Sequence, residues 1–357
     1  MKAATAQINL KALLANFQRV RQMAPDSKVL AVLKANAYGH GLVAIAEQLK
    51  AADAFGVARI EEALALRTGG VVKPIVLLEG FFDKADLPVL VANNMQTVVH
   101  MSSQVDDIVN ATLEGPLKVW LKVDTGMNRL GISAEVFVQD YQRLNQSPNV
   151  QQPMRLMTHF ACADELDSPK THQQISDFKQ LTDTHLLETT MANSAAIIAW
   201  PDSRASWVRP GLMLYGVSPI KGASAEALAL TPVMTLKSSI IAIRQVSQGD
   251  SVGYGAAWVA KQDTFIGVVA IGYGDGYPRH LPSGTPLLIN GQIVPLAGRV
   301  SMDMITVDLG SKPKAALGDE VILWGEGLPV EHIADLAGTI AYELLCNITQ
   351  RVEHIYI

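Results

Sequence analysis

The chain has 357 residues, 49% of them hydrophobic and 18% charged, which is enough apolar material for two domains rather than one. Its formal net charge of -5, without any run of like charges, excludes the basic surface that nucleic-acid binding requires and favours a small-molecule ligand. The two cysteines exclude a disulfide framework, no apolar stretch reaches the ~20 residues of a membrane span, and the first residues lack a signal sequence, so we expect a cytoplasmic protein.

Short apolar runs alternate with helix-like stretches from residue 28 to about 216, the pattern of repeated β-α units around a parallel sheet. We predict eight strands, at 28–34, 54–58, 74–79, 95–100, 117–124, 154–160, 188–194 and 212–216. Amphipathic helices are expected between them, for example over 41–52, 60–70 and 172–187. Eight strands with their crossovers in roughly 200 residues fit a closed (β/α)8 TIM-like barrel better than an open doubly wound sheet.

After Pro232 the pattern changes to β-rich runs without long helices between them. We therefore predict a barrel domain over 8–232 and a mostly β domain over 233–357, which a strand in 1–7 can join. Within the second domain Asn290-Gly291 separates two apolar runs and predicts a tight hairpin. A short helical pair over 330–347 and a last strand over 351–357 end the chain.

In a (β/α)8 barrel the chemistry lies at the C-terminal ends of the strands, so those ends are the first candidates for a site. Polar residues stand there: Lys34, Glu79, His100, Asp124, His159, Asn193 with Ser194, and Tyr215. Lys34 is the most informative, because an amine that loses hydration favours its neutral form, which a base or a Schiff-base lysine requires. The alternative is a lysine that only extends from a strand end into solvent.

Two arginines suggest a bound anion. Arg129 follows the fifth strand and Arg209 precedes the predicted eighth, both among glycines and apolar residues where an unpaired guanidinium is costly. Ser194 at the start of a short helical segment, and Gly211 with Leu212 at the start of the predicted eighth strand, suit a phosphate group. His159 can stack on a ring or accept a hydrogen bond; we expect no metal, because no second ligand pair with zinc spacing accompanies it.

Several longer motifs stand out in chain order: AVLKANAYGHG, KVDTGMNRLG, HFACADE, MANSAAIIAWP, WVRPGLMLYG, VGYGAAW, GYGDGYPR, GRVSMDM and AYELLCN. In this order they resemble the bacterial alanine racemases, enzymes that use pyridoxal 5'-phosphate and combine a (β/α)8 barrel with a β domain. The resemblance runs essentially from end to end. It implies an isomerase that interconverts L-alanine and D-alanine as a homodimer with shared active sites.

The resemblance also implies two bases. Lys34 corresponds to the lysine that holds pyridoxal phosphate through a Schiff base and then moves the α-proton on one face of the substrate. Tyr254 corresponds to the tyrosine that acts on the opposite face from the other subunit. Racemisation needs both, since one base removes the proton and the other returns one from behind.

The remaining matches surround the cofactor and the substrate. The phosphate-binding positions are Tyr38, Ser194, Gly211, Leu212 and Tyr342. Around the ring, Arg209 matches the arginine that faces the pyridine nitrogen, His159 the histidine beside the ring, and Arg129 the arginine near the phenolic oxygen and the substrate. Lys122 matches a lysine that is carbamylated in some relatives to support that arginine. The substrate entrance and carboxylate pocket, supplied by the partner subunit, correspond to Met302, Asp303 and Tyr273.

Arg209 has a consequence for the reaction type. A permanent guanidinium cannot accept the proton of a pyridinium, so the ring nitrogen stays unprotonated and the cofactor is a weaker electron sink. A short-lived carbanion favours racemisation over transamination.

Other functions remain open from the sequence. They are a racemase of broader specificity, a decarboxylase of the same fold, and a non-enzymatic pyridoxal-phosphate-binding protein built on a single barrel. The β domain with Tyr254 favours an enzyme, because a carrier needs no second base from across a dimer interface. D-Alanine made by the enzyme either supplies peptidoglycan synthesis or is degraded, and the resemblance is compatible with both roles.

Overall fold

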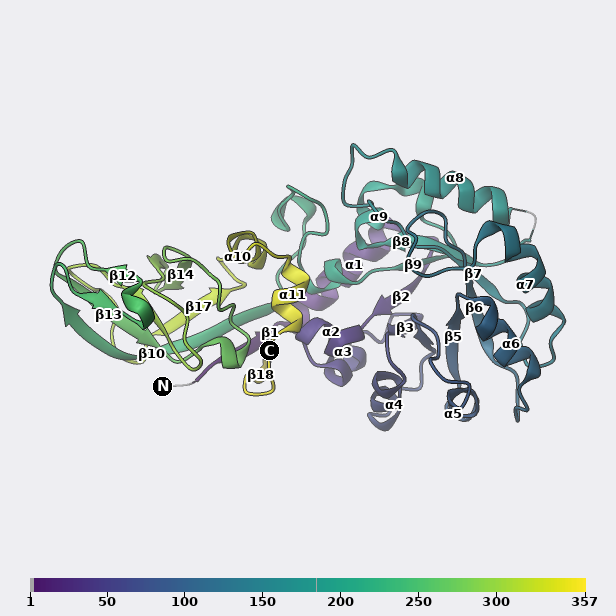
Figure 1. The fold of residues 1–357 in the computed structure, drawn as a ribbon, viewed down its shortest axis with the longest axis horizontal. Helices are drawn as coiled ribbons and strands as arrows, with labels where there is room; N and C mark the ends of the chain where they lie inside the picture. Colours follow the sequence, from purple (N-terminus) through teal and green to yellow (C-terminus); the bar gives the residue numbers. More distant parts are fainter. Residues whose placement is uncertain (1–2, 184) are drawn as a thin grey trace.

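The computed structural model describes residues 3–183 and 185–357, and the chain forms two parts that adjoin at the middle of an elongated molecule (Figure 1). One part is a closed barrel of parallel strands with helices around it, and the other is mostly β. The fold class predicted from the sequence is therefore confirmed.

The barrel strands are short and largely buried, as expected of parallel strands that are covered by helices on the outside. In chain order they are β2 (Lys28–Val32), β3 (Ala54–Val57), β4 (Ile75–Leu77), β5 (Met95–Val99), β6 (Lys118–Lys122), β7 (Arg155–Met157), β8 (Thr189–Asn193) and β9 (Trp207–Arg209). Parallel pairing of β9 with β2, in which Val29 lies opposite Val208, closes the barrel. All the C-terminal strand ends therefore meet at one end of the barrel.

The eighth barrel strand was predicted wrongly. It is β9, which ends at Arg209, whereas the predicted run 212–216 begins as a short 3-10 helix, η2 (Leu212–Tyr215). That run is apolar enough to suggest a strand, but all four of its helical side chains are buried instead of alternating between two faces. Gly216 follows with a φ of 76° and turns the chain away. Arg209 consequently lies at the end of the eighth strand rather than before it.

Helices cover the outside of the barrel between consecutive strands (Figure 1). They are α3 (Leu42–Gln48), α4 (Ile60–Thr68), α5 (Asp86–Ala92), α6 (Ser102–Asn110), α7 (Ala134–Gln146), α8 (Lys170–Thr182) and α9 (Ser194–Ala199), followed by η1 (Pro201–Ser203). An earlier helix, α1 (Leu10–Met23), packs against η2. The predicted helices over 41–52 and 60–70 are present as α3 and α4 with shorter bounds, and the one predicted over 172–187 is present as α8, which begins two residues earlier and ends five residues earlier.

The second part is organised by one long strand, β10 (Met234–Val246). Around it lie β13 (Thr264–Val269), β14 (Pro286–Ile289), β15 (Gln292–Pro295), β16 (Ile305–Asp308) and β17 (Glu320–Trp324). The predicted hairpin joins β14 to β15, and Asn290 and Gly291 both have the positive φ, 49° and 73°, that its tight turn needs. Smaller elements are η3 (Glu226–Leu228), β11 (Ser251–Val252), η4 (Tyr254–Ala256), β12 (Trp258–Val259), η5 (Tyr273–Asp275), α10 (Val330–Ala337) and α11 (Ala341–Cys346).

The two ends of the chain pair with each other near the junction of the two parts (Figure 1). The first strand, β1 (Thr5–Ile8), runs antiparallel to β10 and parallel to the last strand, β18 (Glu353–Tyr356). The N-terminal strand thus belongs to the sheet of the second part.

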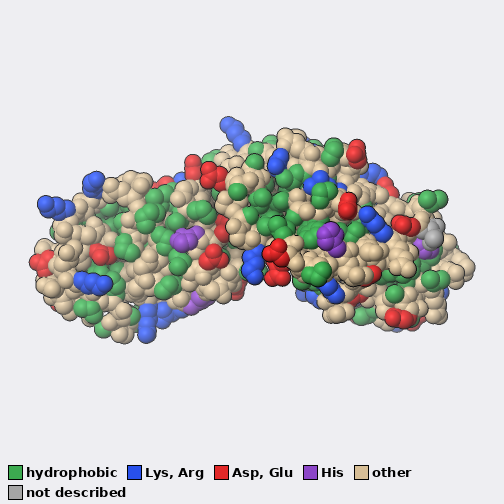
Figure 2. Space-filling view, turned by 90° about the horizontal axis from the view of Figure 1, so that it is seen from above, with side chains coloured by type: hydrophobic (Ala, Val, Ile, Leu, Met, Phe, Trp, Pro, Cys, Tyr) green, Lys and Arg blue, Asp and Glu red, His purple; other side chains and the backbone are tan. Residues whose placement is uncertain are grey.

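The surface agrees with the modest net charge. On the face shown in Figure 2, acidic and basic side chains are scattered over both parts and do not gather into one basic patch. Within residues 3–183 and 185–357, no helix has the length and apolar character needed to cross a membrane.

Candidate active site

A cavity of about 430 Å³ opens at the C-terminal ends of the barrel strands. The predicted site residues of the barrel line it together with one residue of α11: Lys34, Tyr38, Lys122, Arg129, His159, Ser194, Arg209, Gly211, Leu212 and Tyr342. Further lining residues are Val32, Leu78, Glu79, Leu130, Met157, Thr158 and Asn193. The sequence therefore identified most of the polar wall of this cavity.

Lys34 is carried by an unusual stretch of backbone. The strand β2 ends at Val32, two residues earlier than predicted, and Lys34 begins α2 (Lys34–Gly39). Within α2, residues 35–38 have φ between 52° and 55° and ψ between 43° and 53°, and we call this stretch the left-handed turn. Side chains with a Cβ pay about 1–2 kcal/mol per residue in this conformation, so contacts elsewhere must hold the turn in place. The turn brings both Lys34 and Tyr38 to the wall of the cavity.

Hydroxyl and backbone N–H groups gather at one end of the cavity. A Cβ at Gly211 would collide with the hydroxyl of Tyr38, whose ring lies 5.9 Å from that of Tyr342. The hydroxyl of Ser194 accepts hydrogen bonds from the backbone N–H of Gly211 at 2.8 Å and of Met213 at 3.3 Å. Burial raises the pKa of Tyr38 far above its usual value and that of Tyr342 to about 12, so both phenols remain hydrogen-bond donors at neutral pH. Such a group of donors suits a phosphate.

Arg209 is buried at the end of β9 and its guanidinium is held by neutral acceptors. It donates to the hydroxyl of Thr190 and to the carbonyl of Thr158, both at 2.7 Å, and to Nδ1 of His159 at 3.2 Å. Burial lowers the pKa of Arg209 to about 10, which still leaves it charged at neutral pH. Among the residues that the structure describes, no carboxylate lies within ion-pair distance of this guanidinium.

Lys122 ends β6 below Arg129 and is also buried. Burial, the charge of Arg209 and that of Arg129 lower the pKa of Lys122 to about 8. The loop that carries Arg129 is organised by Asp124, whose carboxylate accepts the backbone N–H of Gly126 at 2.7 Å and those of the next two residues. Lys122 can therefore be neutral near pH 8 while Arg129 stays in a fixed loop.

The charge balance of the cavity calls for an anion. The wall contains the basic groups of Lys34, Lys122, Arg129 and Arg209. Among the described residues that line it, Glu79 is the only acidic one, and it is paired with Arg59 at 3.4 Å. A primary amine, several phosphate donors and a guanidinium without a carboxylate form a set that fits pyridoxal phosphate. Within the described part of the chain, no group of three or more His, Cys, Asp or Glu residues is placed to hold a metal ion.

The predicted residues of the β domain lie outside this cavity. Tyr254 is 68% exposed on η4, between the two small strands β11 and β12. Tyr273 and Met302 are also exposed, and Asp303 forms an ion pair with Arg351 at 2.8 Å. None of these four lines the cavity of its own chain.

Sequence reasoning missed Gln174, a buried residue of α8. Its amide donates to the carbonyl of His159 at 3.0 Å and to the hydroxyl of Thr125 at 3.2 Å, and its oxygen accepts the N–H of Ala161 at 2.9 Å. Gln174 thereby fixes the segment that follows β7. The signal was present in the sequence, because this polar residue shares a helical face with Ile175 and Phe178.

Comparison with known proteins agrees with the geometry of the site. Residues 8–219 match the model of the family described as alanine racemase, N-terminal domain, and residues 233–356 that of alanine racemase, C-terminal domain. An alanine racemase of Vibrio cholerae is 58% identical over 356 residues, which cover 100% of this chain and 99% of the relative.

Solved structures are similar over their full length. The biosynthetic alanine racemase of Pseudomonas aeruginosa is 42% identical and superimposes with a TM-score of 0.96, with 100% of each chain covered. The alanine racemase of Acinetobacter baumannii is 38% identical with a TM-score of 0.93, again over 100% of both chains.

Proposed function

The chain belongs to the alanine racemase family, and on this basis we propose that it interconverts L-alanine and D-alanine with pyridoxal phosphate bound in the barrel. One observation carries the proposal within the site. The amine of Lys34, the buried guanidinium of Arg209 and the hydroxyl groups of Tyr38, Tyr342 and Ser194 converge on one cavity.

Each of these residues has a part in holding the cofactor. Lys34 would bind it covalently, while its phosphate would be held by Tyr38, Ser194, Tyr342 and the backbone of Gly211 and Leu212. His159 would lie beside its ring. When bound, pyridoxal phosphate withdraws electrons from the substrate and so makes the α-proton removable. Arg209 would face the ring nitrogen, and its guanidinium could not accept a proton from that nitrogen, which supports racemisation over transamination.

Proton transfer on two faces requires two bases. We assign Lys34 to one face and the partner subunit's Tyr254 to the other, in a homodimer with shared active sites. The exposure of Tyr254, together with its position outside the cavity of its own chain, supports this assignment. In a two-fold symmetric dimer each subunit would supply its Tyr254 to the site of the other, so one interface would complete both sites.

Arg129 would bind the substrate carboxylate and the phenolic oxygen of the cofactor. We propose that Lys122, with its pKa of about 8, reacts as a neutral amine with carbon dioxide. The amine nitrogen bonds to the carbon and releases a proton, and the resulting carbamate is an anion that can pair with Arg129. Such an ion pair would keep the guanidinium of Arg129 oriented toward the substrate.

Preference for alanine would follow from the side chains that close the substrate pocket. We assign this part to the partner subunit's residues at the positions of Tyr273, Met302 and Asp303, all exposed in the β domain. We also propose a cytoplasmic location, in keeping with the free thiols of Cys162 and Cys346.

A panel assay tests the proposed function. Purified protein is incubated with pyridoxal phosphate and single L-amino acids, and the enantiomers are then separated on a chiral column. We expect rapid formation of D-alanine, much slower conversion of larger amino acids, and no conversion by Lys34→Ala. Protein that binds the cofactor but leaves L-alanine unchanged would contradict the proposal.

A further inference from the structure

The left-handed turn is anchored by residues that do not line the cavity. The ring of His40 is fully buried behind it, and Nδ1 donates to the carbonyl of Tyr38 at 2.8 Å and to that of Ala37 at 3.1 Å. The next carbonyl, that of Gly39, accepts a hydrogen bond from Nε2 of His354 at 2.7 Å. The carbonyl groups of the consecutive residues 37–39, at the C-terminal end of the turn, thus accept hydrogen bonds from two imidazole rings.

The second imidazole comes from the last strand of the chain. His354 belongs to β18, and from the same strand Tyr356 donates its hydroxyl to the carbonyl of His40 at 3.2 Å. The partners are 315 and 316 residues apart in the sequence. Neither side chain lines the cavity, so their contact with the site passes through the backbone of the turn.

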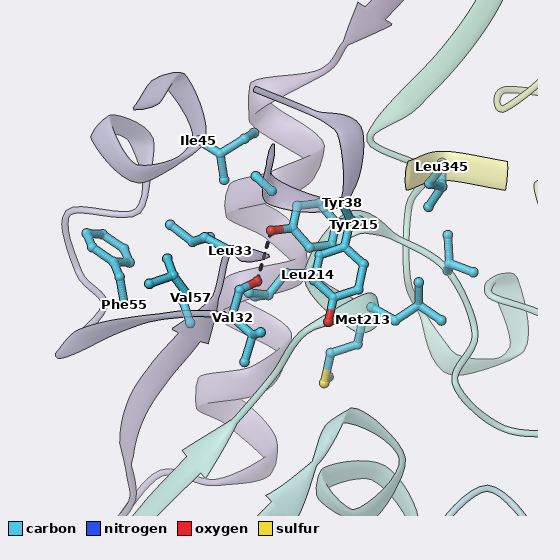
Figure 3. Packing of buried hydrophobic residues seen from close by; sticks show 14 of the residues in the cluster. Val32, Leu33, Tyr38, Ile45, Phe55, Val57, Met213, Leu214, Tyr215 and Leu345 are labelled. Carbon is cyan, nitrogen blue, oxygen red and sulfur yellow. Dashed lines mark hydrogen bonds between the residues drawn. The ribbon is translucent and has the colours of Figure 1, made fainter. Parts of the chain in front are cut away.

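The packing around these contacts is close enough to require glycine. A Cβ on Gly39 would overlap the carbonyl of Leu345 in α11, and a Cβ on Gly41 would overlap the hydroxyl of Tyr356. Figure 3 shows the rings of Tyr38 and Tyr215 next to each other, with Leu345 of α11 to the right of both. Both α11 and β18 of the C-terminal segment therefore pack closely against the turn.

The opposite end of the turn has its own anchor. The carboxylate of Glu62 in α4 accepts the backbone N–H of Ala35, the residue after Lys34, at 2.6 Å. The same carboxylate also accepts the N–H groups of Ala58 and Arg59 at the start of its own helix. The turn is held between the barrel on one side and β18 on the other.

From this arrangement we propose that His354, with the help of Tyr356, is a positioning residue for Lys34 and Tyr38. Without the hydrogen bond to Gly39, the strained backbone of the turn can relax toward ordinary conformations, and the amine and phenol would lose their common direction into the cavity. The inference rests on the proposed function, because it takes Lys34 and Tyr38 as the residues that bind pyridoxal phosphate.

The test compares full-length variants in their affinity for pyridoxal phosphate, followed through the absorbance of the lysine-bound cofactor. His354→Ala removes the donor, whereas His354→Gln places an amide N–H near the position of Nε2. Tyr356→Phe removes only the second hydrogen bond. His332→Ala, at an exposed histidine of α10, is the matched control.

We expect His354→Ala to weaken cofactor binding about tenfold and to shift the absorbance of the bound cofactor, as the loss of one well-placed hydrogen bond predicts. At saturating cofactor, kcat should fall while KM for alanine stays within about twofold. His354→Gln should restore the affinity for pyridoxal phosphate and the absorbance spectrum of the bound cofactor. Tyr356→Phe should bind the cofactor about threefold more weakly, and His332→Ala should bind it as tightly as the wild type does.

Wild-type affinity and spectrum in a folded His354→Ala protein would overturn the inference. So would a His354→Gln protein as defective as His354→Ala. If His354→Ala does not fold, the other two variants test the inference. Wild-type cofactor affinity in His354→Gln and a partial loss of affinity in Tyr356→Phe would support it. A defective His354→Gln together with a Tyr356→Phe that behaves like the wild type would refute it. Wild-type protein that binds no pyridoxal phosphate would refute the proposed function instead, which keeps the two failures apart.

Discussion

The guanidinium of Arg209 donates to Nδ1 of His159 across 3.2 Å, so this imidazole nitrogen carries no proton. Burial and the charge of Arg209 both lower the pKa of His159 well below its ordinary value. The neutral form of His159 is therefore favoured at neutral pH, and in that form it can lie against an aromatic ring without adding a charge. The charge beside His159 is therefore that of the Arg209 guanidinium.

A second buried histidine makes stability depend on pH. Burial lowers the pKa of His40 to about 4, whereas an unfolded histidine titrates near 6.5. Between these values the unfolded chain binds more protons than the folded one, so stability is complete above pH 6.5 and is lost as the pH falls. Because of His40, we expect the free energy of unfolding to be about 2 kcal/mol lower at pH 5 than at pH 7, as measured by urea unfolding.

His40→Asn provides the matched variant for this prediction. Its amide can replace Nδ1 as the donor to the turn, but it does not titrate. The variant should therefore lose less stability over the same pH range. An unchanged pH dependence would show that His40 is not the group responsible.

Shared active sites predict complementation between two inactive proteins. In a mixed dimer of Lys34→Ala and Tyr254→Phe chains, one site carries both substitutions and the other carries neither. Random mixing by unfolding and refolding should therefore restore about a quarter of the wild-type racemase activity. Mixtures that stay inactive although mixed dimers are detected by mass spectrometry would contradict the shared site.

Lys122 should respond to carbon dioxide. We expect a carbamate carbon signal in 13C NMR after exchange with labelled bicarbonate, and a racemase activity that falls in buffer depleted of carbon dioxide. Lys122→Ala should lose the signal and raise KM for alanine about tenfold, because Arg129 loses its support. Lys118→Ala, at the other end of the same strand, is the control and should keep both.

Glu188 should contribute to stability without affecting catalysis. It accepts hydrogen bonds from Lys28 at 2.5 Å, Arg155 at 2.7 Å and the indole of Trp207 at 2.9 Å, on the barrel end away from the cavity. Burial would raise its pKa, but these donors outweigh burial and lower the pKa to about 2. The stabilisation is present above about pH 4.5 and is lost as the pH falls toward 2.

Glu188→Gln should therefore lower the unfolding free energy by about 1–2 kcal/mol at pH 7 while leaving kcat within about twofold. Chemical unfolding and a racemase assay on the same preparation measure both quantities. A large loss of kcat at unchanged stability would be incompatible with a purely structural cluster.

The barrel was predictable because its strands are buried on both faces and read as continuous apolar runs. The exception is β9, which has only three residues and ends at Arg209. The stretch 212–216 is more apolar, and the sequence therefore predicts the eighth strand there instead. The rule that a barrel brings its strand ends together correctly identified Lys34, Glu79, His159, Asn193 and Ser194 as cavity residues, but it also named His100, Asp124 and Tyr215, which do not line the cavity. Lys122 and Tyr342 were identified only by the family resemblance. The same rule cannot find Gln174, which lies on a helix and supports the segment after β7 through hydrogen bonds.

The left-handed turn could not be predicted from residue types. Residues 35–38 contain no glycine, and the side chains that hydrogen-bond the backbone at Ala35 and Gly39 are Glu62 and His354, from distant parts of the chain. Motif matching could identify Lys34 as a site residue, but it gives no reason for the direction of its side chain. That reason lies in tertiary contacts.

The pairing of the two chain ends also orders events during synthesis. The barrel strands are complete at Arg209, whereas β18 is synthesised only after all of them and after the other strands of the β domain. Until then the turn lacks its contacts with His354 and Tyr356. A nascent chain can therefore close its barrel early, but it acquires an ordered lysine only once the β domain has been synthesised as well.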